Sequence, residues 1–181
     1  ELAGLTSYAF ATKVTNTLGH TAYTQIGYYL GKPVDGEDPN QIKSSIYYND
    51  TLDRLTKLIR TVGTSSATQM VYAYDDPNKT VYTYADKDTF GESSTNGGIR
   101  SAAKYDGLGR TWRKAAWEGS TWSITETQFD EIGRVKKTCN PFRTVNLTDG
   151  TPGSAEWTMT DYDGVGRGLC CTNGNKKLRG R

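Results

Sequence analysis

The same six-residue block occurs three times in this chain, and any fold has to accommodate its regular return. Each complete copy reads aromatic, Asp, any residue, aliphatic, Gly, Arg, and the copies occupy 105–110, 129–134 and 162–167. A degraded copy at 49–55 has Asp53 in place of the Gly, and a weaker copy begins at Tyr74. The starts at 49, 74, 105, 129 and 162 give steps of 25, 31, 24 and 33 residues. Such a period indicates a repeat architecture, and the alternating steps indicate hairpins with unequal distal loops.

The chemistry of the block predicts a tight turn. An Asp side chain accepts hydrogen bonds from backbone amides two residues on, and a Gly three residues later supplies the positive φ of a hairpin loop with a bulge. The closing Arg is placed to reach the opening Asp and to fix the register of the hairpin. We therefore expect a structural role for the block residues, which are Tyr105, Asp106, Gly109, Arg110, Phe129, Asp130, Gly133, Arg134, Tyr162, Asp163, Gly166 and Arg167.

The residues between the blocks alternate as strands do. Segments 81–84 and 122–129 alternate along their length and are rich in Thr, Val, Ile, Tyr and Trp, which is typical of strands with one covered face. Turn-forming residues predict loops at 31–40, 90–98 and 140–154. The fold class expected is all-β, an antiparallel series of β-hairpin repeats with little or no helix.

Size and charge limit the alternatives. The chain has 181 residues and a mass of 20.0 kDa, which fits one domain or a piece of a larger protein. We expect a repeat region at 1–172 and a basic tail at 173–181. A net charge of +2 gives no field that would favour nucleic acid, and no apolar run is long enough to predict membrane insertion.

These blocks resemble the Rhs or YD-repeat family, named for its Tyr-Asp dipeptide followed by an aliphatic residue, Gly and Arg. Segments 14–20 and 28–34 also look like this family, so the resemblance covers essentially the whole chain. It implies successive hairpins in one long antiparallel sheet that winds into a shell, with any toxic or processing activity outside the repeats. It also implies a larger bacterial exported protein, acting outside the cell or at its surface.

The residues that could carry chemistry are few. His20 is the only histidine, and no Ser lies in a Gly-x-Ser-x-Gly sequence. Cys139, Cys170 and Cys171 lack the spacing of a zinc site. For the adjacent Cys170 and Cys171 a strained disulfide stays open as an alternative, and a pair of buried thiols is the expectation. The acidic loop 35–40 does not match a calcium-binding loop, and no glycine-rich segment fits a phosphate cradle. We therefore expect no metal site and no cofactor.

Three functions remain open from the sequence. The leading hypothesis is a non-enzymatic shell segment that encapsulates or contacts a protein partner, or pairs with other copies of itself through open sheet edges. A hydrolase that uses two acidic residues is the first alternative. A carbohydrate-binding β module is the second, with sugar stacking on Trp112, Trp117 and Trp122, and Trp157 as a further aromatic.

Overall fold

The structure is a computed structural model, and it describes residues 10–94, 98–173 and 176–178, without the side chains of 94 and of 170 onward. The described residues form β-strands and one short 3₁₀ helix, η1 (Glu92–Ser94). The strands are β1 (Lys13–Thr15), β2 (Thr21–Gly27), β3 (Lys32–Glu37), β4 (Lys43–Tyr47), β5 (Lys57–Arg60), β6 (Thr68–Asp75), β7 (Thr80–Ala85), β8 (Ile99–Tyr105), β9 (Thr111–Trp117), β10 (Trp122–Phe129), β11 (Val135–Cys139), β12 (Phe142–Thr144), β13 (Trp157–Tyr162), β14 (Gly168–Asn173) and β15 (Lys176–Leu178). The predicted all-β class is confirmed.

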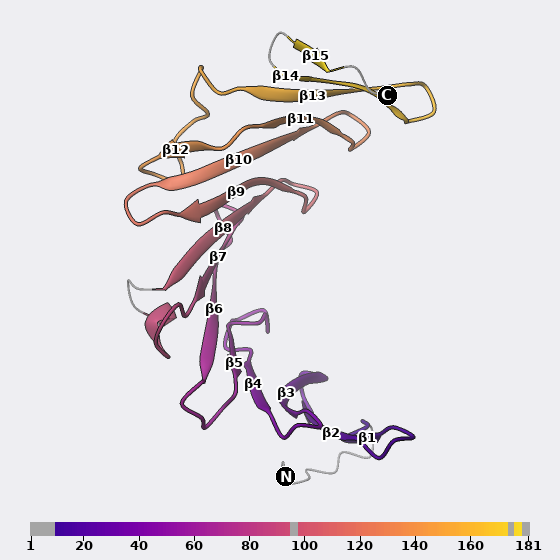
Figure 1. Ribbon diagram of the computed structural model, residues 1–181, viewed down its shortest axis with the longest axis vertical. Coiled ribbons are helices and arrows are strands. Elements are labelled where there is room, and N and C mark those ends of the chain that lie inside the picture. The colour runs from indigo at the N-terminus through magenta and orange to yellow at the C-terminus, as the bar shows by residue number, and fades with distance from the viewer. Residues whose placement is uncertain (1–9, 95–97, 174–175, 179–181) are drawn as a thin grey trace. The chain divides into compact units, whose positions relative to one another are not determined.

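The strands follow one another in the sheet in the order of the chain (Figure 1). Each strand from β1 to β11 is hydrogen-bonded to the next, and the order then continues through β13, β14 and β15. β12 lies off this path and pairs with the first half of β10, while β11 pairs with the second half. Antiparallel neighbours joined by short turns are the arrangement that a series of hairpins gives, so this part of the prediction is also confirmed.

The chain divides into two compact units, and each is described by itself. The first unit comprises Glu1–Ala73 with Thr83–Arg100, and the second comprises Tyr74–Tyr82 with Ser101–Arg181. β15 lies inside the segment that the sequence assigned to a basic tail. The boundary expected between repeat region and tail at 172 and 173 stays a prediction.

The core of the second unit is small and is centred on β10. Ile124 is fully buried, and it is surrounded by Ala102, Ala115 and Leu147. Tyr82, Trp122 and Phe142 pack against this cluster while remaining partly exposed. Burying a side chain such as Ile124 stabilises the folded state by roughly 1.5 to 3 kcal/mol. Because this core is small, turns and cross-strand pairs must also specify the fold.

Two of the predicted loops are wrong in extent. The segment predicted as a loop at 31–40 contains β3, because a bulge admits its proline: Ile26 pairs with Pro33 and Gln25 with Asp35, which leaves Val34 as the extra residue. The segment predicted as a loop at 140–154 contains β12. In the third predicted loop, 90–98, the structure has η1, and residues 95–97 lie outside the described part.

Candidate functional site

The six-residue block forms a closed hydrogen-bonded turn, shown here for the copy between β8 and β9. Asp106 Oδ1 accepts the backbone N–H groups of Leu108 and Arg110, both at 2.9 Å, and Asp106 Oδ2 accepts Arg110 Nε at 2.7 Å. The Gly109 N–H donates to the Asp106 carbonyl at 3.2 Å, and Gly109 has φ of 76°. One carboxylate therefore holds two backbone amides and a guanidinium, and the positive φ returns the chain to its partner strand.

The other two complete copies have the same geometry. Asp130 accepts the N–H groups of Ile132 at 3.2 Å and Arg134 at 2.8 Å, and Arg134 Nε at 2.7 Å. The corresponding contacts of Asp163 are at 3.0, 2.8 and 2.7 Å. The glycines have φ of 90° and 86°. In each of the three hairpins the strand register also shifts just before the block's aromatic residue.

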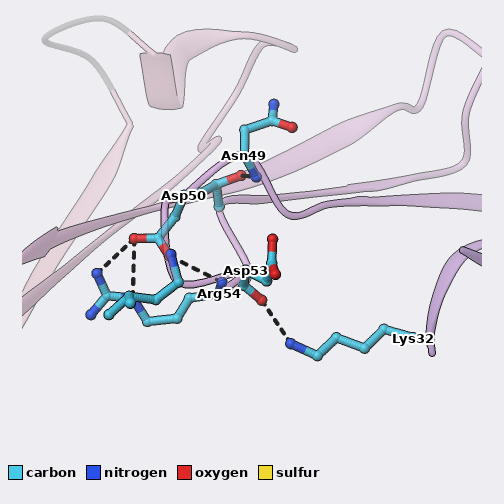
Figure 2. Close-up of polar contacts among 7 residues, drawn as sticks. Lys32, Asn49, Asp50, Asp53 and Arg54 are labelled. Carbon is cyan, nitrogen blue, oxygen red and sulfur yellow. Dashed lines mark hydrogen bonds and ion pairs between the residues drawn. The ribbon is translucent and has the colours of Figure 1, made fainter. Parts of the chain in front are cut away.

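The degraded copy between β4 and β5 keeps the same turn without its glycine (Figure 2). Asp50 Oδ1 accepts the N–H groups of Leu52 and Arg54, and Arg54 Nη2 lies 2.6 Å from Asp50 Oδ2. Asp53 takes the glycine position at φ of 53°, a conformation that Asp adopts more readily than most residues. Lys32 Nζ donates to the Asp53 carbonyl at 2.7 Å and lies over the ring of Tyr48 at 5.2 Å.

Two further turns of this kind carry no Arg. Asn16 Oδ1 accepts the N–H groups of Leu18 and His20 at 3.0 and 2.9 Å, with Gly19 at φ of 83°. Asp38 Oδ1 accepts those of Asn40 and Ile42, both at 2.9 Å, with Gln41 at φ of 65°. The first turn lies in segment 14–20, which the sequence already marks as similar to the family, with an Asn three residues before Gly19. Sequence reasoning missed the second as a turn copy, because Gln41 stands where the block has its Gly.

The weak copy at Tyr74 departs from the pattern. Asp75 accepts the N–H of Asn78 at 3.2 Å and contacts the Asn78 side chain with both carboxylate oxygens. Lys79 has the positive φ, 49°, in place of the residue three after the Asp. The hairpin between β6 and β7 is thus closed by a related turn with shifted contacts.

The carboxyl groups of the complete turns and of the degraded copy are held in the charged form. The side-chain hydrogen bond from Arg54 lowers the pKa of Asp50 from 3.8 to about 2. The backbone N–H of Arg110 is the main cause of the lowered pKa of Asp106, and the Arg167 side chain is that of Asp163. For Asp130, desolvation opposes the shift, yet the bonds from Arg134 leave the pKa lowered. Carboxylates with lowered pKa are good acceptors and poor proton donors.

Arginines of the block also connect one block to the next. The guanidinium carbon of Arg110 lies 4.2 Å from the ring centroid of Phe129, the aromatic that opens the following block. Arg134 lies at the same distance from the ring of Tyr162, which opens the block after that. The Tyr162 hydroxyl donates to the Val135 carbonyl at 2.8 Å. Arg110 and Arg134 thus each bond their own Asp and lie over the next block's aromatic ring, a link between blocks that sequence reasoning missed.

The tryptophans proposed for sugar stacking contact groups of the protein itself. The ring of Trp112 has Arg113 at 5.0 Å and Lys104 at 6.0 Å from its centroid. Trp117 and Trp122 are cross-strand partners whose ring centroids are 5.2 Å apart. The ring of Trp157 has Lys137 at 4.3 Å. These are the cation–π and cross-strand aromatic pairs that stabilise a sheet.

A buried ion pair lies beneath the loop after β12. Arg113 and Glu126 are each almost fully buried and form an ion pair with each other. Arg113 Nη1 donates to the Leu147 carbonyl at 2.6 Å, and the Thr151 hydroxyl donates to Glu126 Oε2. Two strands and the loop are thereby tied together. Sequence alone cannot place these two charges, because alternation does not say which face is covered.

The remaining candidate residues have local partners. His20 is exposed, and its Nδ1 lies 3.3 Å from Asn16 Nδ2. Cys139 is a buried free thiol whose pKa is raised by burial, whereas the side chains of Cys170 and Cys171 lie outside the described part. Within the described ranges, no group of three or more His, Cys, Asp and Glu side chains is arranged to hold a metal ion. The same ranges contain no helix long and apolar enough to cross a membrane.

Comparison with known proteins identifies the fold. No protein-family model and no curated protein matches the sequence. The crystal structure of TcdB2-TccC3 is similar, with a TM-score of 0.68 at 17% sequence identity. The match covers 92% of this chain and 11% of that one, so the chain spans a small part of its structural neighbour. Likeness at this identity concerns the fold alone, and the chain has a distant Rhs-like β-fold.

Proposed function

We propose that the chain is a non-enzymatic scaffold segment of a YD-repeat shell, which encapsulates or contacts a protein partner. The main observation in support is that the charged side chains of the repeated block make contacts within the protein itself. Each Asp of a complete block bonds two backbone amides and its own Arg, and Arg110 and Arg134 stack on the next block's aromatic. By the family resemblance, we also propose that the segment belongs to a larger exported bacterial protein, toxin-associated or at the cell surface.

The hydrolase alternative has little support in the carboxyl groups. A glycoside hydrolase needs one carboxyl group with a raised pKa to protonate the leaving group. In the described residues, the carboxyl groups whose pKa is shifted have a lowered pKa instead. Hydrogen bonds from backbone N–H groups lower the pKa of Asp86 although burial opposes this, and the Asp88 N–H is the main cause that lowers the pKa of Glu92 to about 2. A hollow of about 340 Å³ at the β10–β11 turn is lined by Asp130 and Glu131, but Asp130 is paired with Arg134.

The carbohydrate alternative also loses support from geometry. Sugar stacking needs an open ring face, whereas cations lie over Trp112, and the rings of Trp117 and Trp122 contact each other at an interplanar angle of 59°. Trp117→Ala therefore tests this alternative directly. We expect the unfolding midpoint of this variant to fall through loss of the Trp122 contact, with no glycan binding to lose on an array.

A substrate screen tests the scaffold proposal. The purified chain is assayed against chromogenic glycosides and esters and a fluorogenic peptide, beside Asp106→Asn, Asp130→Asn and Asp163→Asn. Glu118→Gln serves as a control, because Glu118 pairs with Arg143 outside the blocks. We expect turnover at the buffer rate for every protein. Turnover by the wild type that disappears in one Asp variant while the protein stays folded would sink the proposal.

A further inference from the structure

An irregular segment of the second unit lies against one face of the sheet. It runs from residue 145 to residue 155, between β12 and β13, and we call it the strap (Figure 1). The structure describes all of its residues, and among them only Leu147 is buried. Val145 is 66% exposed, and the segment 152–154 is exposed as well. The strap therefore has a single buried apolar anchor.

The strap is held by one side chain and two hydrogen bonds. Leu147 packs into the core cluster around Ile124. Arg113 Nη1 donates to the Leu147 carbonyl at 2.6 Å, and the Thr151 hydroxyl donates to Glu126 Oε2. We call the surface beneath the strap, which is the Ile124 cluster together with Arg113 and Glu126, the seat.

The strap also has hydrogen bonds of its own. The Asp149 N–H donates to the Asn146 carbonyl, and Asp149 Oδ2 accepts the Asn146 N–H, both at 3.2 Å. The Ala155 N–H donates to the Pro152 carbonyl at 2.9 Å. The Thr144 hydroxyl donates to Asp149 Oδ2, which ties the first of these turns to the end of β12. None of these bonds involves the seat, so the strap retains them when it moves away about the end of β12.

The charges of the seat stay paired without the strap. Arg113 Nε donates to Glu126 Oε1 at 2.7 Å, so the two side chains are partners of each other as well as of the strap. When the strap leaves, water reaches this ion pair and relieves the cost of burying it. Water also takes over the Leu147 carbonyl and the Thr151 hydroxyl. The main loss is therefore the burial of one aliphatic side chain.

We propose that the strap opens from its seat and closes again as one unit, while the strands of the second unit stay paired. Local opening of this kind is typical of segments that few buried contacts hold in place. In the open state the seat presents an aliphatic surface beside an ion pair, which the closed strap withholds from any partner. This inference goes beyond the scaffold function and does not depend on it.

Cys139 provides a reporter of the open state. Its Sγ accepts the Glu126 N–H at 3.0 Å, and the residue is only 3% exposed. It thus lies beside the residue that holds Thr151, where opening of the strap admits water and reagent. In Cys170→Ser/Cys171→Ser, Cys139 is the remaining thiol of the full chain. Its reaction with 5,5′-dithiobis(2-nitrobenzoate) is followed by absorbance.

The urea dependence of this reaction separates strap opening from global unfolding. Opening exposes little surface, so we expect a labelling rate that is nearly independent of urea below the unfolding transition. We also expect this rate to exceed the rate that the global unfolding equilibrium allows, as measured by circular dichroism on the same protein. A labelling rate that rises with urea as steeply as global unfolding does would overturn the proposal.

A matched pair of threonine variants tests the hydrogen bond to the seat. In the reporter background, Thr151→Val removes the hydroxyl that donates to Glu126, and Thr148→Val changes an exposed residue of the same strap. We expect Thr151→Val to speed the labelling of Cys139 at least tenfold in buffer without urea, because the closed state alone loses a bond to a buried carboxylate. Thr148→Val should stay within twofold.

A second pair tests the apolar anchor. Leu147→Ala should speed the labelling at least tenfold, because it removes the side chain that the strap buries. Val145→Ala, at an exposed position of the strap, should stay within twofold. The faster labelling of Leu147→Ala should remain independent of urea below its transition, which a mere loss of global stability does not give.

The outcomes separate the two proposals. Labelling of Cys139 no faster than global unfolding allows, or equal rates for Thr151→Val and Thr148→Val, overturns the opening strap and leaves the scaffold function standing. Turnover in the substrate screen removes the scaffold function, whereas the labelling rates still decide the strap on their own.

Discussion

Replacing turn glycines by alanine separates the cost of the backbone from the cost of the Arg–aromatic link. Gly109 has φ of 76°, and a Cβ built there meets nothing within 4 Å. Gly109→Ala therefore adds only the left-handed strain, roughly 1 to 2 kcal/mol. For a chain of this size about 1 kcal/mol lowers Tm by roughly 2 to 4 °C, so we expect a fall of about 2 to 8 °C.

Gly133→Ala carries the same strain and one more cost. A Cβ at Gly133, where φ is 90°, lies 3.1 Å from Arg110 Nη1. The guanidinium then has to move relative to the ring of Phe129, which forfeits an exposed cation–π contact of about 0.5 to 1 kcal/mol. Urea unfolding followed by circular dichroism measures both variants, alone and in an Arg110→Met background, where the two should become equal. A Gly133→Ala that is no more destabilising than Gly109→Ala would refute the reasoning.

Three more results are expected. In urea unfolding, Asp106→Asn should retain most of the stability, because Asn16 makes the same turn with an amide side chain. Asp106→Ala should lose clearly more stability, because it leaves two backbone N–H groups of the turn without their acceptor. Equal losses of stability in the two variants would contradict this. The pKa of Asp50 is about 2 in the folded protein and 3.8 ordinarily, so its contribution to folding stability is present above about pH 4 and is lost as the pH falls toward 2. The urea midpoint of the wild type should therefore fall between these pH values, and that of Asp50→Asn should fall less. Arg113→Met should lower the free energy of unfolding by about 3 to 5 kcal/mol, because it leaves Glu126 buried and unpaired. The double variant Arg113→Met/Glu126→Leu should restore most of this loss. A double variant as unstable as the single one would argue against the buried pair.

Local chemistry explains which parts of the fold could be predicted. The Asp-to-Gly spacing of the complete blocks determines a turn from the residues within it, so the hairpins and the all-β class follow from the sequence. The strand β3 was predicted as a loop because it contains Pro33. The bulge that accommodates this proline forms with the neighbouring strand β2, so it is not visible in the local sequence. Likewise, β12 is recognisable only once the edge of β10 is in place.

The candidate site shows the same division between local and long-range contacts. The bond between Asp106 and Arg110 is reachable from a spacing of four residues. The stacking of Arg110 on Phe129 depends on the register between β9 and β10, which the block does not encode. The contact of Arg113 with Leu147 joins residues 34 positions apart, so it is beyond any local pattern.

Amide hydrogen exchange at the turns is the most direct test that the charged residues of the block serve the fold. In each complete block the Asp side chain accepts the N–H groups of the second and fourth residues after it. We predict that the amides of Arg110 and Arg134 exchange at least tenfold more slowly than in an unstructured peptide. In Asp106→Ala, exchange should speed up at Arg110 and stay slow at Arg134. Fast exchange at both amides in the wild type, or no change on replacing Asp106, would contradict the structural role of the block.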